Sequence, residues 1–136
     1  LVLLKLAKLT DKEQFEQIAM RSLESMQESM RQHPLGFSNW LCGLDLYLSA
    51  PKEITIIGPR DHPETLELLH ILCGTWLPNK VVAAYDPNDP APVSGLKLFE
   101  NRQMVDNQPT VYVCEHYTCQ APVTDPASLC AQLQGG

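Results

Sequence analysis

The stretch EITIIG, residues 53–58, decides the fold class of this chain. It is short, rich in β-branched residues and bounded by turn residues, which is typical of a strand buried on both faces. A helical pattern begins at Asp61, with Pro63 in its first turn, and a second apolar run, KVVAAY, occupies residues 80–85. A strand, a helix and a strand within about thirty residues predict a parallel strand pair with a right-handed crossover.

The chain beyond residue 85 predicts one more strand and one more helix. The prolines of DPNDPAPVSG, residues 86–95, exclude regular pairing and indicate a surface loop. Residues 96–99 fit a brief strand or a turn of helix, and TVYVC, residues 110–114, fits a third strand. Thr124 or Asp125 caps the last helix. That helix carries these side chains inward: Leu129, Cys130 and Leu133.

The first fifty residues have helical periodicity. We interpret LVLLKLAKL, residues 1–9, as the tail of a helix whose beginning was cut away, so the chain is expected to be a fragment. A capping box of Thr10 and Glu13 starts the next helix, which Pro34 ends, and another helix follows before Pro51. These two helices predict an antiparallel hairpin. The apolar stripes expected to be buried are Phe15, Ile18, Ala19, Leu23, Met26 and Met30, then Phe37, Trp40, Leu41, Leu44 and Leu48, and, in the helix after Asp61, Leu66, Leu69, Leu72, Cys73 and Trp76.

The predicted fold is therefore α/β (or α+β) and has two segments. Residues 1–50 form an α-helical hairpin, and residues 51–136 form a small three-layer α/β unit around a mainly parallel, roughly three-stranded sheet. A chain of 136 residues with 44% hydrophobic and 19% charged residues suits one compact unit. A two-domain enzyme is excluded.

Charge and hydropathy exclude two classes of partner. The formal net charge is −6 and no basic run occurs, whereas binding to nucleic acid phosphates needs clustered cations. Residues 1–9 are apolar but too short for a membrane span of about 20 residues. A charged helical stretch follows them instead of a signal-peptide cleavage site. We expect neither a nucleic acid nor a membrane as a partner.

The cysteines point to a reducing compartment. There are five, an odd number, dispersed along a chain without a secretion signal, which suits reduced thiols and a cytoplasmic location. Cys42 and Cys73 fall inside apolar helical stretches, where a free cysteine usually acts as a small hydrophobe.

The stretch CEHYTCQ, residues 114–120, is the most unusual part of the sequence. Two unpaired thiols, Cys114 and Cys119, are the favoured interpretation. A reversible disulfide is the second, because a turn can bring two Cα atoms within the roughly 5.5 Å that bridging needs. A metal site is the third and least favoured, because the other histidines outside this stretch lie on distant segments. We expect no metal and no cofactor.

The turn GPRD, residues 58–61, is a second candidate site. It lies at the carboxyl end of the first strand and at the start of a helix, where open α/β sheets bind ligands and where helix N-termini favour anions. The turn lacks the glycine spacing of a phosphate loop, so a plain connection is favoured. If a ligand binds, Gly58, Arg60 and Asp61 hold it, with Arg60 as the cation.

No catalytic group stands out elsewhere. Asp45 is the acidic residue within an apolar helical run and is expected on an exposed face. His70 is expected to be a half-buried structural histidine rather than a base. No nucleophile–histidine–acid arrangement has local support.

Four stretches together resemble a known family. They are PKEITIIG at residues 51–58, LPNKVV at 77–82, PTVYVC at 109–114 and TCQAPVTDP at 118–126. They are similar to the C-terminal region of the YyaL-like family, the thioredoxin-domain-containing proteins that include the spermatogenesis-associated protein of animals. The resemblance covers nearly the whole chain, and its most specific block is CQAPVTDP.

The resemblance implies a larger architecture. Complete members look like a thioredoxin-like domain, then an α/α toroid similar to six-hairpin glycosidases, then an α/β element near the C-terminus. Residues 1–50 would be the last helices of the toroid and residues 53–133 the α/β element. The thioredoxin-like cysteines lie upstream, so no catalytic residue transfers to this chain. Cys114 and Cys119 match the family pattern position by position.

Three functions follow as hypotheses. The first is a non-catalytic C-terminal module that packs against the toroid of its parent chain and self-associates as an isolated fragment. The second is a redox element in which Cys114 and Cys119 cycle with the upstream thioredoxin-like domain. The third is a sugar or nucleotide site at Gly58, Arg60 and Asp61.

Overall fold

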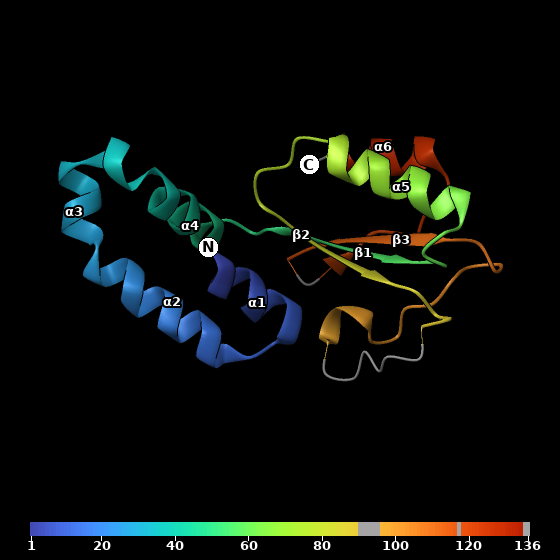
Figure 1. The fold of residues 1–136 in the computed structure, drawn as a ribbon, viewed down its shortest axis with the longest axis horizontal. Coiled ribbons are helices and arrows are strands. Elements are labelled where there is room, and N and C mark those ends of the chain that lie inside the picture. Colours follow the sequence, from blue (N-terminus) through green and yellow to red (C-terminus); the bar gives the residue numbers. More distant parts are fainter. Residues whose placement is uncertain (90–95, 117, 135–136) are drawn as a thin grey trace.

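The computed structural model describes residues 1–89, 96–116 and 118–134, which fold as a helical segment and an α/β unit. Figure 1 shows the helical segment, residues 1–50, beside a sheet that carries two helices above it. Most of the loop predicted at residues 86–95 lies outside the described residues.

The sheet has the strand order β2-β1-β3-β4. Strand β1 (Lys52–Ile57) is central, and its last four residues are buried, as predicted for EITIIG. Strand β2 (Lys80–Tyr85) pairs with β1 in parallel, and helix α5 (Pro63–Gly74) connects the two. The predicted parallel pair is therefore confirmed, and Pro63 occupies the first turn of α5.

The sheet as a whole is mixed, so the prediction of a mainly parallel sheet is wrong. Strand β3 (Thr110–Glu115) runs antiparallel to β1, with Thr110 opposite Ile57. The chain leaves β2 at Tyr85, passes the short helix η2 (Lys97–Phe99) and enters β3 on the other side of β1. It enters at the end of the sheet where β1 and β2 finish, so β3 runs antiparallel to β1. A two-residue strand β4 (Thr118–Cys119) adds a fourth strand to the three that were predicted.

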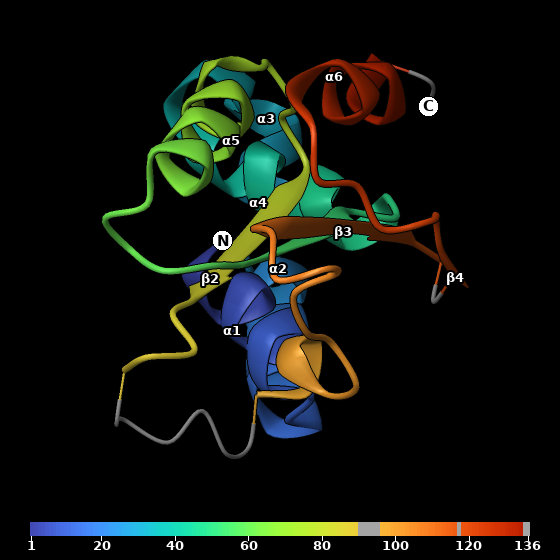
Figure 2. The same cartoon turned by 90° about the vertical axis from the view of Figure 1, so that its right-hand side faces the viewer.

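The sheet is the middle of three layers, as predicted, although helix α1 (Val2–Thr10) of residues 1–50 contributes to the third. Helices α5 and α6 (Pro126–Gln134) cover one face of the sheet, whereas α1 and η2 lie against the other face (Figure 2). Asp125 caps α6 by accepting a hydrogen bond from the Ser128 backbone N–H at 2.9 Å. The buried core between β1, β3 and the two helices is formed by Ile54, Ile56, Leu68, Leu72, Val111, Val113, Val123, Leu129 and Leu133.

The helical segment begins differently from the prediction. Helix α1 includes Thr10, whose hydroxyl donates to the Leu6 carbonyl at 2.7 Å. Thr10 therefore ends α1 and does not cap the next helix, α2 (Glu13–Ser25), whose N-cap is Lys12. The chain reverses at Asp11, which adopts a left-handed conformation with φ 54°.

The long helix predicted up to Pro34 is two helices. α2 ends at Ser25, and α3 (Gln27–Gln32) follows after Met26. Near this break the Ser22 and Ser25 hydroxyls donate to the carbonyls of Ile18 and Ser22 at 2.8 Å, a type of contact that bends helices. The 3-10 turn η1 (Pro34–Phe37) then leads into α4 (Ser38–Leu48), which matches the second predicted helix.

Several apolar side chains predicted to be buried lie in solvent. Leu48 is 73% exposed and Trp76 is 86% exposed, the latter because α5 ends at Gly74. Ile18 and Leu66 are also exposed, as are the Cys42 and Cys73 thiols, so their interpretation as buried small hydrophobes is wrong. The buried cluster of the helical segment contains Leu4, Ala19, Leu23, Met30 and Leu46.

Candidate functional site

A disulfide joins Cys114 in β3 to Cys119 in β4. The two residues are opposite each other in an antiparallel hairpin, and Glu115 pairs with Thr118 one step nearer the turn. His116 supports the turn with a left-handed backbone, φ 50°. Of the three alternatives that the sequence left open, the structure shows the disulfide, because the hairpin register places the two sulfurs together.

The two sulfurs differ in exposure. Cys114 is 3% exposed because it lies between two neighbouring strands, beside Glu53 of β1 and opposite Cys119 of β4. Cys119 is exposed because β4 is the edge strand. The segment after Cys119 is held to α6 by Gln132, whose side-chain amide donates to the Ala121 carbonyl at 2.8 Å.

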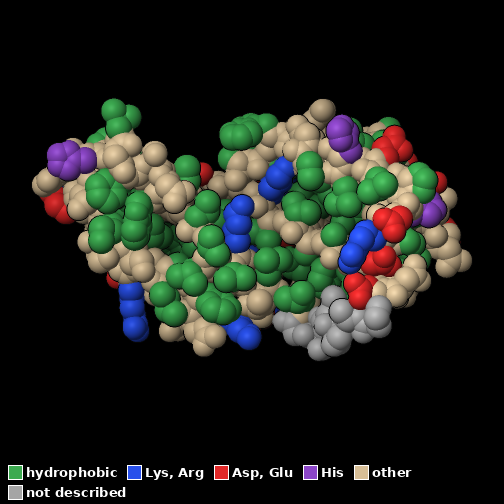
Figure 3. Space-filling view, viewed as in Figure 1, with side chains coloured by type: hydrophobic (Ala, Val, Ile, Leu, Met, Phe, Trp, Pro, Cys, Tyr) green, Lys and Arg blue, Asp and Glu red, His purple; other side chains and the backbone are tan. Residues whose placement is uncertain are grey.

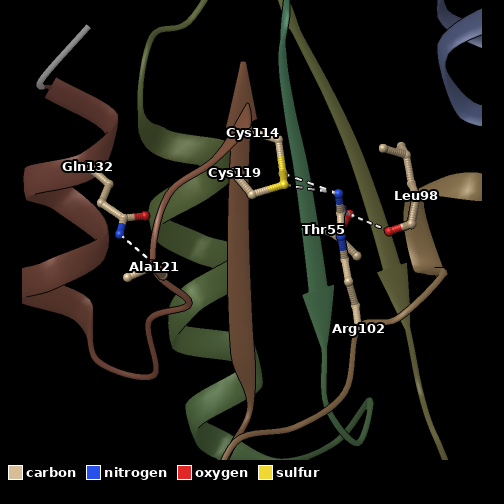
Figure 4. Close-up of a disulfide and its surroundings, with 7 residues drawn as sticks. All are labelled: Thr55, Leu98, Arg102, Cys114, Cys119, Ala121 and Gln132. Carbon is tan, nitrogen blue, oxygen red and sulfur yellow. Dashed lines mark hydrogen bonds between the residues drawn. A yellow bond between two sulfur atoms is a disulfide. The ribbon is translucent and has the colours of Figure 1, made fainter. Parts of the chain in front are cut away.

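Arg102 connects the disulfide to the centre of the sheet. Its Nη2 donates to Cys114 Sγ at 3.1 Å and to Cys119 Sγ at 3.5 Å. Its Nη1 donates to the hydroxyl of Thr55, which is fully buried and itself donates to the Leu98 carbonyl at 3.1 Å. Figure 4 shows the guanidinium group between the disulfide and Thr55.

The aromatic ring of Tyr112 completes the surroundings of Arg102. The guanidinium carbon lies 5.6 Å from the ring centre, a distance typical of a cation–π contact. The Tyr112 hydroxyl donates to the carbonyl of Gln103, the next residue along the chain from Arg102, at 2.8 Å. Burial lowers the pKa of Arg102, and the charge of Glu53 opposes that shift. The guanidinium is thus held in place from three sides.

The disulfide and Arg102 line a groove of about 360 Å³ between the helical segment and the sheet. Helix α1 and the start of α2 form one wall, and β1, β3 and the segment around η2 form the other. A salt bridge of 2.7 Å between Lys97 and Asp11 links the two walls. The other charged side chains that line the groove are Lys8, Lys12, Glu13, Glu16, Glu53 and Glu100.

Glu53 is the carboxylate that lies beside the disulfide in the sheet. It is the register partner of Cys114. Burial raises the pKa of Glu53, and the positive charges of Lys8, Arg102 and Lys97 act in the opposite direction. The groove therefore combines a disulfide, a half-buried arginine and a carboxyl group whose pKa is raised by burial.

At the turn around Gly58, carboxylates of the chain itself bind Arg60. Arg60 donates its backbone N–H to the Asp86 carboxylate at 2.7 Å, and its side chain forms a 3.1 Å salt bridge with Asp89. The hydrogen bonds from the backbone of Arg60 and Asn88 lower the pKa of Asp86. A carboxylate of the chain itself thus takes the backbone donor that a bound anion would use.

The space at this turn is also small. A hollow of about 140 Å³ is lined by Gly58, Arg60 and Asp86 among others, and Asp61 lies exposed beside the turn. A methyl group at Gly58 would approach Thr65 Oγ1 to 2.6 Å, so the glycine allows the turn to pack closely. Ligand binding by Gly58, Arg60 and Asp61 stays a prediction.

The remaining candidates lie apart from these sites. Asp45 is exposed, as expected, and accepts a hydrogen bond from the Asn79 amide at 2.7 Å, which links α4 to the α/β unit. His70 is exposed rather than half-buried. Within residues 1–89, 96–116 and 118–134, no group of three or more His, Cys, Asp or Glu side chains could hold a metal ion. Within the same residues, no helix is long and apolar enough to cross a membrane.

Sequence reasoning found the two cysteines but missed Arg102, Thr55 and Glu53. The sequence pattern identified Thr55 and Glu53 only as residues of a buried strand, although these two polar residues are two positions apart and so lie on the same face of it. Arg102 lies in an irregular segment and meets Thr55 across 47 residues of sequence, so no local pattern marks it.

The comparisons with known proteins point to a part of a longer chain. The chain is 30% identical over 109 residues to human spermatogenesis-associated protein 20, and 30% identical over 129 residues to the rat protein of that name. The mouse protein is 29% identical over 109 residues.

These three proteins are homologues of most of the chain. The alignments cover 79%, 93% and 79% of this chain but only 14%, 16% and 14% of the human, rat and mouse proteins, respectively. The chain thus spans about one sixth or less of the length of these relatives. No family model and no solved structure matches it.

Proposed function

We propose that this chain is a non-catalytic module near the C-terminal end of a larger YyaL-like, spermatogenesis-associated protein. In this proposal the helical segment packs against an α/α toroid of the same parent chain, and an upstream thioredoxin-like domain is a further partner. The observation that carries the proposal is the alignment of 93% of this chain with 16% of the rat relative.

The packing of the helical segment supports this proposal. A hollow of about 180 Å³ is lined by apolar side chains of α2, α3 and α4, among them Met20, Met30 and Leu44. A second hollow of about 280 Å³ lies against Leu1, Leu4 and Trp40 among others. Both hollows open to solvent, and apolar concave surfaces usually mark interaction sites, so neighbouring helices of the parent chain would fill them.

Exposed apolar residues add to this support. Leu35 is 95% exposed at the turn before α4, and Leu48 is exposed at its end. Figure 3 shows hydrophobic side chains across much of the face that the helical segment presents in this view. Surfaces of this type usually mark interaction sites.

Sedimentation velocity over a series of concentrations tests the proposal. We expect the isolated chain to self-associate, because its apolar hollows have no other cover. Leu48→Gln should weaken this association, whereas Trp76→Gln, which changes an even more exposed residue of the α/β unit, should leave it unchanged. A chain that stays monomeric at high concentration would contradict the proposal.

A second candidate function is a thiol–disulfide redox element. The observation that favours it is the Cys114–Cys119 disulfide, which lines the groove and has one exposed cysteine, Cys119. Exposed disulfides are the ones that exchange with other thiols, and their potentials tend to be less reducing than those of structural disulfides. The upstream thioredoxin-like domain is the expected partner.

Differential alkylation with mass spectrometry tests the redox function. The chain is equilibrated in glutathione buffers that span cytosolic to oxidising potentials, and the state of Cys114 and Cys119 is read at each potential. The redox function requires a midpoint within the cytosolic range. If the pair stays oxidised, or stays reduced, at every potential, the disulfide has no redox role.

A further inference from the structure

We propose that Arg102 makes this disulfide directional: an incoming thiolate attacks Cys119 Sγ, and Cys114 leaves as a thiolate held by the Arg102 guanidinium. The proposal rests on the redox function above and assigns a different task to each sulfur. Arg102 acts as a positioning residue, and a thiol compound is the class of substrate.

Access to the two sulfurs is unequal. Thiol–disulfide exchange needs a thiolate to reach one sulfur and displace the other. Cys119 is exposed on the edge strand, whereas Cys114 is 3% exposed between β1 and β4. An external thiol therefore reaches Cys119 first.

Charge also distinguishes the sulfurs. Arg102 Nη2 lies 3.1 Å from Cys114 Sγ and 3.5 Å from Cys119 Sγ, so the shorter contact is to the buried sulfur. A hydrogen bond from a guanidinium strengthens when its acceptor becomes an anion. Cationic neighbours lower thiol pKa values, and a thiol of lower pKa is the better leaving group.

The attachment of Arg102 makes this contact persistent. Thr55 and the Tyr112 ring fix the guanidinium on the sheet, so it needs no rearrangement when the sulfur–sulfur bond breaks. The negative charge of the Glu53 carboxylate, beside Cys114, disfavours a thiolate at Cys114. The other charged side chains that line the groove are Lys8, Lys12 and Lys97, and Asp11, Glu13, Glu16 and Glu100. Arg102 is the cation that contacts the sulfurs directly, so we expect its effect to prevail.

The exchange balances with two thiols as the reductant. A thiolate RS⁻ forms a bond to Cys119 Sγ, the Cys114–Cys119 bond breaks, and its electron pair goes to Cys114 Sγ. A second thiolate then attacks the R-side sulfur of the mixed disulfide and releases Cys119 as a thiolate. The products are RSSR and the two reduced cysteines, and each cysteine takes a proton according to its pKa.

The chain after the disulfide stays attached to the sheet during these steps. The Gln132–Ala121 hydrogen bond and the pairing of Val111 with Val123 hold the chain after residue 120. Breaking the disulfide therefore frees little more than the short β4 edge, and Cys114 stays beside Arg102.

Two readouts test the proposal with glutathione as the probe thiol. First, the oxidised chain is mixed briefly with reduced glutathione, quenched with acid and mapped by tandem mass spectrometry. Glutathione should be found on Cys119, and glutathione mainly on Cys114 would overturn the proposal. This readout needs no variant of Arg102.

Second, the alkylation rate of Cys114 in the reduced chain is measured against pH. Arg102→Gln should move the midpoint up by about one pH unit, which lowers the thiolate fraction about tenfold at pH values well below the midpoint. Arg102→Lys should keep part of the shift, and Arg31→Gln, at an exposed arginine far from the site, should change nothing. An unchanged midpoint in a folded Arg102→Gln chain overturns the proposal. If Arg102→Gln does not fold, the midpoint of Arg102→Lys is compared with that of the native chain instead, and an unchanged midpoint again overturns the proposal.

The outcomes separate this proposal from the redox function. If the disulfide never opens in glutathione buffers, the redox function fails and the proposal falls with it. If the disulfide opens and closes but glutathione attaches to Cys114, or Arg102→Gln leaves the midpoint unchanged, only the directional role of Arg102 fails.

Discussion

The α/β unit and the helical segment differ in how completely they bury their apolar side chains. In the α/β unit, Ile54, Val111 and Leu129 are 0% exposed between the sheet and two helices. In the helical segment, the buried residues border two open apolar hollows, and Leu35 and Leu48 lie in solvent. The α/β unit therefore has the larger and more completely buried core, although Leu66 and Trp76 are exposed on it, and the helical segment has the smaller one.

This difference follows from what each part can pack against. The central strand β1 is covered by α5 on one face and by η2 on the other, where α1 of the helical segment also lies against the sheet. Each Å² of apolar surface that it buries contributes about 25 cal/mol. Helices α2 to α4 pack only partly against α1, and an apolar helix face that α1 leaves open needs a further layer to bury it. The contrast indicates that the α/β unit supplies the stability and that the helical segment supplies a surface.

Truncation of a core leucine in each part gives the largest expected effect. Leu129→Ala should lower the free energy of unfolding by about 3 kcal/mol, because its site is closed on all sides. Leu46→Ala, in the helical segment, should cost about half as much, since the neighbouring hollows let the site collapse or hydrate. Urea unfolding followed by circular dichroism measures both losses. An equal or larger loss for Leu46→Ala would contradict the contrast between the two parts.

Removal of the disulfide sharpens the comparison in the α/β unit. The double variant Cys114→Ala with Cys119→Ala should lower the free energy of unfolding by about 2 kcal/mol, the value for a small closed loop in the chain-entropy model. Reduction of the native chain by dithiothreitol should give a similar loss in urea unfolding. The same reductant should not change the double variant, which serves as the control. A native chain insensitive to reduction would contradict this expectation.

The glycines of the α/β unit test its close packing. A Cβ at Gly58 would lie 2.6 Å from Thr65 Oγ1 and 2.9 Å from Pro109 Cβ, so Gly58→Ala should cost about 1–2 kcal/mol. Gly74→Ala is the matched control, because no atom lies within 4 Å of its added Cβ at the end of α5. This control should stabilise the chain by about 0.5 kcal/mol. Thermal unfolding of both variants measures the difference, and a neutral Gly58→Ala would show a looser turn.

The smallest expected effect concerns Glu53 and pH. Because its folded pKa is raised, its contribution to stability is fully present below the unfolded pKa and is lost as pH rises through the folded pKa. Glu53→Gln should therefore raise the free energy of unfolding at pH 7 by about a few tenths of a kcal/mol, since the group is half exposed and screened. At pH values below about 4 the variant and the native chain should be equally stable. A gain in the free energy of unfolding that is larger at acid pH than at pH 7 would contradict a raised pKa of Glu53.

Local sequence patterns predicted the elements of the α/β unit well. The β-branched run at residues 54–57, the proline at the start of α5 and the aspartate cap of α6 act through their immediate neighbours, and each of these predictions is confirmed. The apolar stripe of α4 was also found, but Leu48 on it is exposed, since periodicity identifies an apolar face and not what covers it.

Features that depend on distant residues could not be predicted. The antiparallel direction of β3 is set by the path through η2, and Thr10 ends α1 because the chain reverses at Asp11. The Cys114–Cys119 pair was identified as a possibility, but its pairing depends on the hairpin register, and the role of Arg102 depends on contacts with Thr55 and Tyr112.

Hydrogen exchange of the isolated chain, read by mass spectrometry, tests the central contrast most directly. Amides of β1, β3 and α6 should be protected close to the level of global unfolding, because their core is closed. Amides of α2, α3 and α4 should exchange at least about tenfold faster, since these helices open without unfolding the sheet. Equal protection of both parts would show that the helical segment has a complete core of its own, and would contradict its proposed role as a surface for the parent chain.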